Sequence, residues 1–308
     1  MLKKNLRGLA RRTVMQLAKW RLLSGRKASI LLHRILLGRF PDLNAPKDLN
    51  EIIIFLSHYT DISDWHRLAD KYAVREYVKE KIGDHILVPL YQVADSPDEI
   101  DFDALPQSFV VKITDGFARN IIVRDKSQAD ISGIKKKLKK WMTEKHIGDE
   151  PHYLKIKRKI IVEQLLPGPM EGIAPVDYKF ICVNGTPLYC LACSNRDMTT
   201  FRSQFTLYRL PGWEDTDGIT PGWESKEGVS KPELLNEMME YAKILSKGFP
   251  LVRIDLYQVE GKIYFGEITF TSCAGREMKI KQEMLTEIGK KVDLSKAHII
   301  TDKISSRK

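Results

Sequence analysis

The stretch that decides the fold runs from Leu251 to Phe270 and reads LVRIDLYQVEGKIYFGEITF. Both halves are rich in β-branched and aromatic residues, and the only turn signal between them is Glu260-Gly261, so the stretch predicts a β-hairpin. A three-residue loop beginning at Val259 would place Gly261 in the left-handed conformation that glycine adopts at little cost. The predicted register pairs Gln258 with Lys262, Asp255 with Glu267, and Arg253 with Thr269.

Four polar residues interrupt the apolar arms of this hairpin. Arg253 and Asp255 lie two apart on one arm, and Glu267 and Thr269 lie two apart on the other. Alternate residues share a face of a sheet, so all four are expected on one patch. Two opposed carboxylates repel unless a cation lies between them. Because Mg²⁺ is usually held by one or two carboxylates plus substrate phosphates, the patch predicts a metal site for a nucleotide.

The composition predicts a chain of two linked lobes. It has 308 residues, of which 43% are hydrophobic, enough for a sizeable core. The expected strands and helices mix without a regular βαβ alternation, which indicates the α+β class with antiparallel sheets. The clearest linker runs from Pro167 to Gly172. The predicted division is an arm at 1–44, a helical and strand region at 45–105, a first lobe at 106–166 and a second lobe at 167–308.

Local signals place the other elements. Asn50 is expected to cap a helix ending at His58, and a second helix is expected over 64–82. Residues 198–231 read as a long irregular loop. Further predictions are strands at 108–114, 120–124 and 158–166, a basic helix at 130–145, a hairpin around Asn184-Gly185 and a helix at 232–247.

The cysteines indicate a reducing compartment. Cys190 and Cys193 have the spacing of a redox or zinc pair, but the nearby sequence holds no second pair of Cys or His. The segment around them reads as a strand, which favours buried thiols. We therefore expect a cytoplasmic protein.

The basic charge is concentrated in the first 39 residues, which hold eleven Lys and Arg and no acid. As a helix, this arm would carry basic residues on one side and an apolar face on the other. This pattern predicts a helix lying on an anionic membrane surface, at the inner face of the membrane. The alternative is a basic helix docked on its own domain. The apolar face comprises Leu2, Leu6, Leu9, Thr13, Leu17, Trp20 and Leu23.

Other readings of this arm are less favoured. Nucleic-acid binding is not expected, because the body lacks a matching interleaving of basic and aromatic residues. No apolar run approaches the length of a membrane span, and no small-residue cleavage site follows the basic start.

A set of ordered segments accompanies the hairpin: Asp70–Val78 (DKYAVREYV), Phe109–Lys112, Asn120–Val123, Ile161–Glu163 and Asp177–Phe180. Together with the hairpin they closely resemble the ATP-grasp fold, in the TupA-like branch associated with teichuronopeptide and other cell-surface polysaccharides. The resemblance extends from about Ala45 to Gly275 and implies two α+β lobes that grip ATP. The implied chemistry is activation of a carboxylate as an acyl phosphate, which an amine then captures.

The resemblance also implies roles for individual residues. Lys112 looks like the strand lysine that reaches the α- and β-phosphates, and Lys71 resembles the lysine that approaches from the other side. Asp177 stands where an acid binds the ribose, and Lys179 points the same way. The implied adenine hinge comprises Glu163, Gln164, Leu165 and Leu166. The implied metal ligands are Asp255, Glu267 and Thr269, and the implied catalytic residues are Arg253, Lys112 and Lys179.

Two positions depart from the pattern of this branch. The phosphate loop, usually rich in glycine, reads Thr114-Asp-Gly-Phe-Ala-Arg-Asn120, with Gly116 as its only glycine and Arg119 added. Thr269 stands where related enzymes often place an asparagine. Both departures leave nucleotide binding expected and put turnover in question.

The leading hypothesis is therefore an ATP- and Mg²⁺-dependent carboxylate–amine ligase of surface polysaccharide assembly. Its substrates would be a sugar acid or amino acid, including lipid-linked precursors. Trp213, Trp223, Arg202 and Arg209 are candidates for binding a sugar and its carboxylate. The alternatives are a sugar or lipid kinase, and a non-catalytic nucleotide-binding subunit. A glycosyltransferase is disfavoured because no Asp-x-Asp metal motif stands where a sugar nucleotide would need one.

Overall fold

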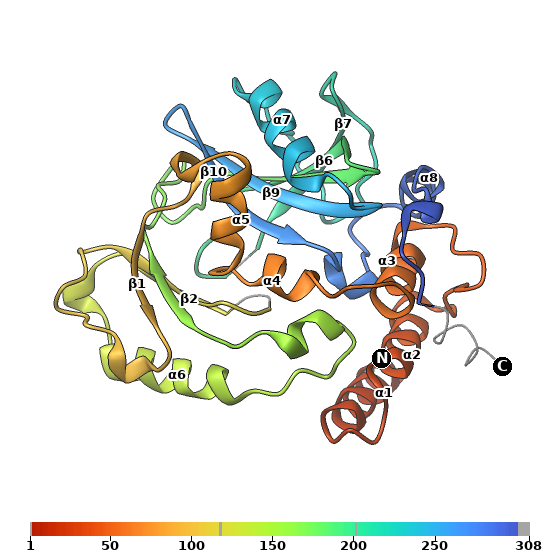
Figure 1. The fold of residues 1–308 in the computed structure, drawn as a ribbon, viewed down its shortest axis with the longest axis horizontal. Coiled ribbons are helices and arrows are strands. Elements are labelled where there is room, and N and C mark those ends of the chain that lie inside the picture. The colour runs from red at the N-terminus through yellow and green to blue at the C-terminus, as the bar shows by residue number, and fades with distance from the viewer. Residues whose placement is uncertain (1, 117–118, 201, 301–308) are drawn as a thin grey trace.

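A computed structural model describes residues 2–116, 119–200 and 202–300, and it contains two antiparallel sheets (Figure 1). The smaller sheet has the order β1-β4-β2-β3 and the larger has the order β10-β9-β5-β6-β7-β8. The predicted α+β class with antiparallel sheets is confirmed. The smaller sheet comprises β1 (Leu90–Ala94), β2 (Phe109–Ile113), β3 (Asn120–Val123) and β4 (Ile160–Glu163). The larger comprises β5 (Asp177–Val183), β6 (Thr186–Ser194), β7 (Gln204–Arg209), β8 (Glu214–Asp215), β9 (Leu251–Val259) and β10 (Lys262–Thr269).

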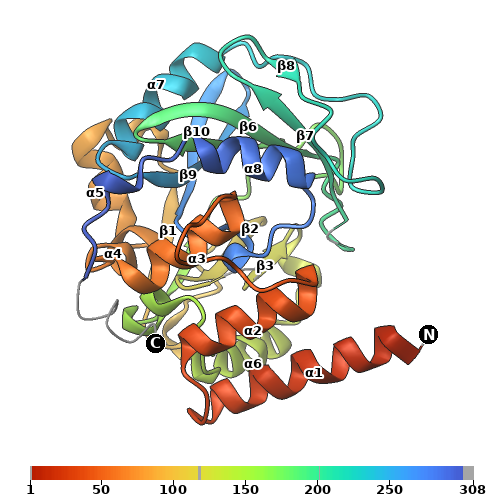
Figure 2. The same ribbon diagram turned by 90° about the vertical axis from the view of Figure 1, so that its right-hand side faces the viewer.

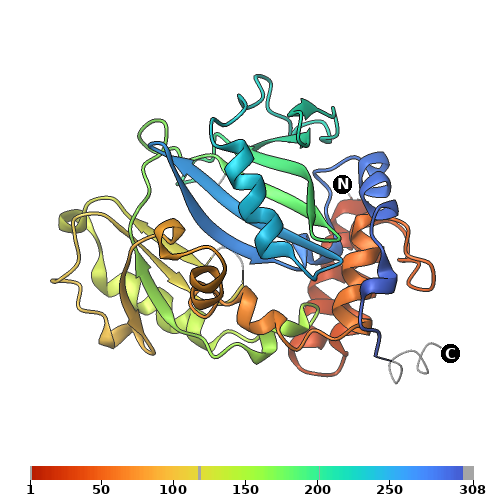
Figure 3. The same ribbon diagram turned by 45° about the horizontal axis from the view of Figure 1, so that its top comes forward.

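Each sheet has its own hydrophobic core. Helix α6 (Ile131–Thr143) packs on the smaller sheet, where Leu138 contacts the buried side chains of β2 and β4. Helix α7 (Leu235–Ser246) crosses one face of the larger sheet (Figure 3). The same core of the larger sheet includes side chains from α3 (Leu49–Tyr59), α4 (Trp65–Ala69), α5 (Val74–Lys81) and α8 (Gln282–Lys290).

The hairpin differs from its predicted turn, although the pairing of its acids is as predicted. The loop has two residues rather than three, because Glu260 (φ 49°) and Gly261 (φ 70°) both take the left-handed conformation of a tight hairpin turn. Gln258 therefore pairs with Ile263, and the predicted pairing with Lys262 is wrong. A bulge between Phe265 and Glu267 then shifts the register by one residue. This shift restores the pairs Asp255–Glu267 and Arg253–Thr269.

Two predicted helices begin or end elsewhere. Asp48, not Asn50, caps α3, because the Asp48 side chain accepts a hydrogen bond from the Glu51 backbone amide. The predicted helix 64–82 is two helices, α4 and α5. Asp70 interrupts it in an extended conformation, and its carboxylate accepts hydrogen bonds from the amides of Tyr72 and Ala73. A short side-chain acceptor that satisfies the backbone locally competes with the helix.

The segment 198–231, which was predicted to be an irregular loop, contains two strands. β7 pairs with β6, and β8 pairs with β7, so the segment extends the larger sheet. The ring of Trp213 stacks on Tyr208 with centroids 4.1 Å apart, and its indole N–H donates to the Val229 carbonyl.

The basic arm forms two packed helices, α1 (Leu2–Lys19) and α2 (Gly25–Leu37), which lie apart from both sheets (Figure 2). The prediction of a single helical face that reaches Leu23 is wrong, because α1 ends at Lys19 and Arg21 takes a positive φ of 62°. The buried contact between the helices is made by Val14, Ala18, Ala28 and Leu32. Of the predicted apolar face, Leu6, Leu9 and Trp20 are exposed, and Leu2 lies outside the described side chains.

Candidate active site between the two sheets

The four polar residues of the hairpin converge, as their spacing predicts. Arg253 Nε donates to Asp255 Oδ1 at 2.7 Å, and Arg253 Nη2 donates to Asp255 Oδ2 at 2.8 Å and to Glu267 Oε1 at 3.0 Å. Thr269 Oγ1 also donates to Glu267 Oε1, at 3.0 Å. In this structure the cation between the two carboxylates is therefore the guanidinium of Arg253. The sequence had predicted a divalent metal ion in that place.

The neighbouring strand β5 adds a second charged group to this patch. Lys179 Nζ donates to Asp255 Oδ2 at 2.5 Å and to Asp177 Oδ2 at 2.6 Å. Arg196 also donates to Asp177 Oδ2, at 2.7 Å. Burial by itself would raise the pKa of Asp177, but Lys179 and Arg196 outweigh it and lower that pKa to about 2. Arg196 was not predicted; its only sequence signal is its position soon after β6.

One oxygen of this buried group lacks a partner. Asp177 is 2% exposed, and its Oδ1 atom has no hydrogen-bond partner among the described residues. A buried carboxylate oxygen without a donor is costly. A ligand hydroxyl that donated to this atom would remove the cost.

The two carboxylates among the metal-ligand candidates differ in accessibility. The Asp255 side chain is 1% exposed, whereas the Glu267 side chain is 36% exposed. Burial disfavours the charged form of Glu267, but the charges of Lys71 and Arg253 outweigh it and lower its pKa to about 2. Glu267 is therefore an accessible, ionised carboxylate. No cluster of three or more His, Cys, Asp or Glu side chains in the described residues is placed to hold a metal ion.

Three further cations come from the smaller sheet and from the segment around α5. Lys112 on β2 donates to Glu163 Oε2 at 2.6 Å, and Arg75 on α5 donates to Glu163 Oε1 at 3.1 Å. Lys71, in the turn between α4 and α5, donates to the Gly116 carbonyl at 2.8 Å. Burial lowers the pKa of Lys71, while the charge of Glu267 acts to raise it. Lys71 therefore lies between the phosphate loop and the acids of the hairpin.

Arg119 is held away from these lysines by a separate ion cluster. Its guanidinium donates to Asp115 Oδ1 at 2.9 Å and to Glu144 Oε2 at 3.2 Å. Asp115 is buried and also bonds Arg158 and His146. In this arrangement Arg119 ties the loop to its own lobe. Phe117 and Ala118 of the predicted loop lie outside the described residues.

The predicted adenine hinge follows the end of β4. Glu163 is buried and ion-paired, and the Gln164 amide donates to the Pro89 carbonyl at 2.9 Å. Leu165 is half-buried. Leu166 belongs to an apolar cluster at the turn end of the hairpin, with Val88 and Val259 at its centre and Tyr257 and Tyr264 packed against it.

A segment missed by the sequence analysis borders the site on the far side. Glu150 precedes the short 3-10 helix η4 (Pro151–Lys155) and accepts a hydrogen bond from Thr271 Oγ1 at 2.5 Å. Tyr153, in that helix, is stacked on His146 with ring centroids 5.6 Å apart. Burial raises the pKa of Tyr153, and the charges of Glu150 and Glu267 raise it further. No motif marks this segment, because its position depends on contacts across the two lobes.

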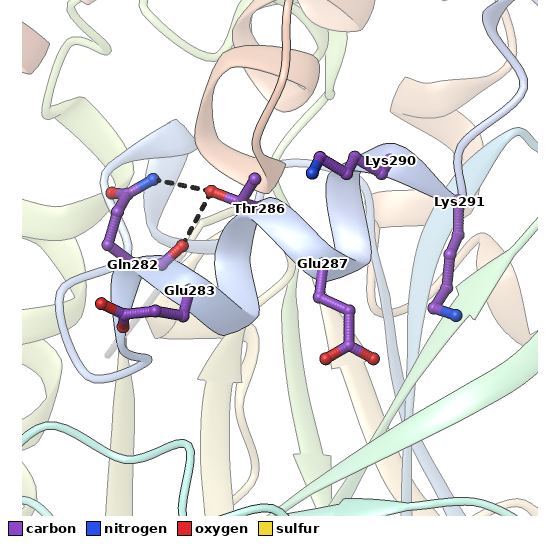
Figure 4. A pocket seen from close by; sticks show the side chains of 6 residues that line it. All are labelled: Gln282, Glu283, Thr286, Glu287, Lys290 and Lys291. Carbon is purple, nitrogen blue, oxygen red and sulfur yellow. Dashed lines mark hydrogen bonds between the residues drawn. The ribbon is translucent and has the colours of Figure 1, made fainter.

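The other candidate residues lie elsewhere. Trp213 is packed inside its own lobe, and Arg209 is paired with Glu287 of α8 at 2.6 Å. Trp223 is 44% exposed, with the Lys279 ammonium 5.8 Å from its ring centroid. A surface depression of about 530 Å³ runs along α8 and contains no predicted site residue (Figure 4). It is lined by Gln282, Glu283, Thr286, Glu287, Lys290 and Lys291.

Two further predictions concern cysteines and membranes. Cys182, Cys190 and Cys193 are buried free thiols on β5 and β6, as expected for a strand, while Cys273 is exposed. Within the described residues, no helix combines the length and the apolar character needed to cross a bilayer.

Comparison with known proteins identifies a family. A family model described as TupA-like ATPgrasp matches residues 51–293. No curated protein matches the chain by sequence.

Several solved structures are similar in shape. A D-alanine–D-alanine ligase from Bacillus anthracis complexed with ATP has a TM-score of 0.43 at 13% identity, over 73% of this chain and 62% of that one. The Helicobacter pylori enzyme of the same name has a TM-score of 0.42 at 13% identity, over 80% and 67%. An Aspergillus clavatus N5-carboxyaminoimidazole synthase with ADP and 5-aminoimidazole ribonucleotide has a TM-score of 0.42 at 13% identity, over 69% and 47%. The chain thus spans about half to two thirds of their length.

Proposed function

The chain belongs to the TupA-like ATP-grasp family, and on that premise we propose that it is an ATP- and Mg²⁺-dependent ligase. It activates a carboxylate as an acyl phosphate and joins it to an amine, forming an amide. The observation that carries this proposal is the polar patch on β9 and β10. There the carboxylates of Asp255 and Glu267 share one guanidinium, and the Glu267 side chain is 36% exposed.

The residues present fit a divalent metal ion. Oxygens of Asp255 and Glu267 lie within 3.0 Å of the same atom, Arg253 Nη2, so they already hold one cation between them. Carboxylate and hydroxyl oxygens suit Mg²⁺, and Thr269 supplies the hydroxyl. When bound, Mg²⁺ would neutralise negative charge on the phosphate oxygens of ATP. Binding of the metal requires Arg253 to leave the position between the two acids.

The residues also fit a nucleotide. We assign adenine to the segment Glu163 to Leu166, in which Leu166 packs with the apolar side chains of Val88 and Val259. The unpartnered Oδ1 of Asp177 is suited to accept a hydrogen bond from a ribose hydroxyl.

The basic side chains of the site have separate proposed roles. We assign Lys112 and Lys71 to the phosphates, with Gly116 giving the chain room to approach them. Lys179 holds Asp177 and Asp255 in place and supplies positive charge to the phosphoryl group. Arg253, freed from the carboxylates, stabilises the charge that develops as phosphate is transferred and as the amine attacks. Arg119 acts on the loop, and its contact with phosphate requires release from Asp115.

The substrates follow from the family and from the arm. We propose a sugar acid or amino acid as the carboxylate, in surface polysaccharide assembly. The exposed Leu9, on a helix rich in Lys and Arg, and Trp20, directly after that helix, would bring the enzyme to anionic lipids at the inner membrane face, beside lipid-linked precursors. The protein would thus be cytoplasmic and peripheral to the membrane.

The test is a phosphate-release assay that screens uronic acids against amino acids, with mass spectrometry of the product. A ligase releases one phosphate for each amide formed. A kinase yields a phosphorylated product without free phosphate, and a non-catalytic subunit yields neither. Either of these last two outcomes contradicts the proposal.

A further inference from the structure

The alternating polar residues of β10 continue beyond the metal-ligand candidates Glu267 and Thr269. Glu267, Thr269 and Thr271 are alternate residues, and Thr271 lies just past the end of the strand. The Thr271 hydroxyl bonds Glu150, which comes from the segment between α6 and β4. The opposite lobe thus delivers a carboxyl group to the end of the row.

The axis of the hairpin indicates which end of a nucleotide Glu150 would meet. Val259, at the turn end of β9, packs with Leu166 of the proposed adenine hinge. Arg253 lies six residues back along β9, on the order of 20 Å away. Arg253 also donates to Ser272, next to Thr271, at 2.7 Å. If adenine lies at the turn end, the transferred phosphate lies toward Arg253, and Glu150 lies beyond it.

The surroundings of Glu150 suit proton transfer. Burial raises its pKa to about 7, with the charges of Asp149 and Glu267 acting in the same direction. The hydrogen bond from Thr271 and the charge of Arg276, which pairs with Asp149 at 2.7 Å, act to lower it. Tyr153 is the other titratable neighbour in this segment. A carboxylate that titrates near neutral pH can accept a proton and release it again.

We propose that Glu150 is the general base that accepts a proton from the acceptor amine. This inference rests on the proposed ligase function and deepens it. The acceptor ammonium gives one proton to the Glu150 carboxylate, and the freed nitrogen lone pair attacks the acyl carbon. The C–N bond forms as the C–O bond to phosphate breaks, and the phosphate leaves with the electron pair and the second nitrogen proton. The acceptor is accordingly an amine that is protonated at neutral pH, such as the amino group of an amino acid.

The test compares two nucleophiles in the Glu150→Gln variant, with the carboxylate identified by the assay above. Hydroxylamine is neutral at pH 7 and needs no base, whereas an amino acid amine must first lose a proton. General bases contribute about 100-fold or more, so the ratio of amide to hydroxamate should fall by about 100-fold. Glu171→Gln, an exposed acid in the segment after β4, is the matched control and should keep the ratio of the natural chain.

The outcomes separate the two proposals. If the natural chain forms no ATP-dependent hydroxamate with any acid tested, the ligase function fails and this inference with it. If the natural chain forms both products and Glu150→Gln lowers them equally, only the base assignment is overturned.

A second measurement tests the proposal even if the Glu150→Gln variant does not fold. Thr271→Val should move the acidic limb of the pH profile for amide formation to higher pH, because the carboxylate loses a donor. Asp149→Asn should move it to lower pH, because a neighbouring negative charge is removed. Limbs that stay in place in both variants would overturn the assignment.

Discussion

Asp255 on β9 and Glu267 on β10 lie directly opposite one another, and both carboxylates bond the guanidinium of Arg253. Like charges across a sheet destabilise it unless a cation compensates. Here Arg253 compensates, which lets the hairpin fold while keeping two carboxylates on one face. In the proposed ligase, the same three side chains would serve both folding and the binding of the metal.

The substitution Glu267→Gln should lower the rate of ATP-dependent phosphate release by at least about 100-fold and leave the fold intact. An amide is a poorer ligand for Mg²⁺ than a carboxylate, while its shape is the same. Phosphate release and the thermal unfolding curve are the measurements. Glu260→Gln, at the exposed hairpin turn, is the control and should be fully active. Turnover at the natural rate in Glu267→Gln would remove Glu267 from the site.

The substitution Gly266→Ala should weaken both the hairpin and the site. A Cβ there would lie 3.0 Å from the Asp255 carbonyl oxygen and 3.0 Å from the Tyr257 ring. We expect the free energy of unfolding to fall by about 1–3 kcal/mol and the affinity for MgATP to fall with it. Gly8→Ala on α1, where no atom lies within 4 Å, is the control. An unchanged affinity would show that the bulge does not set the position of Asp255.

The buried Asp115 should make stability depend on pH. Burial would raise its pKa, but His146 and Arg158 outweigh burial and lower the pKa from 3.8 to about 2. Since the folded value lies below the unfolded one, the stabilisation is complete above pH 3.8 and is lost as the pH falls toward 2. It amounts to about 2.5 kcal/mol. The loss of unfolding free energy in Asp115→Asn should therefore be larger at pH 6 than at pH 2, by roughly this amount. An equal loss of unfolding free energy at both pH values would contradict this explanation.

The exposed apolar residues on α1 and directly after it should be needed for membrane binding. Leu9 and Trp20 are 56% and 62% exposed. Their joint replacement by Ser should prevent sedimentation with anionic liposomes, because the apolar contact is lost while the charge is kept. Met170→Ser, equally exposed at 66% on the body, is the control. Continued sedimentation of the double variant would contradict the membrane proposal. Truncation is a poorer test, because Arg39 is paired with Asp48 and Glu51.

The sequence predicted what depends on alternation and local turns. The pairing of Asp255 with Glu267 was correct although the loop length was wrong, because the bulge at Gly266 offset the shorter turn. A single Gly in a strand, such as Gly266, is a signal of such a bulge. The hairpin at Asn184-Gly185 formed as its turn residues predict.

What the sequence did not predict depends on contacts between distant segments. Asp48 was not foreseen as the cap of α3, because Asn50 is an equally good cap by type and is instead bonded to the backbone of Glu277. Glu150 comes within reach of Thr271 only when the lobes assemble. The partner of Arg119 could not be foreseen either, since Asp115 collects its cations from three separate segments.

The most direct test of the central claim is a crystal structure with ADP and Mg²⁺ bound. We expect a metal ion about 2.1 Å from an oxygen of Asp255 or Glu267, with the Arg253 guanidinium displaced from between them and the ribose against Asp177. A structure in which Arg253 still bridges both carboxylates, while nucleotide and metal are held elsewhere, would contradict it.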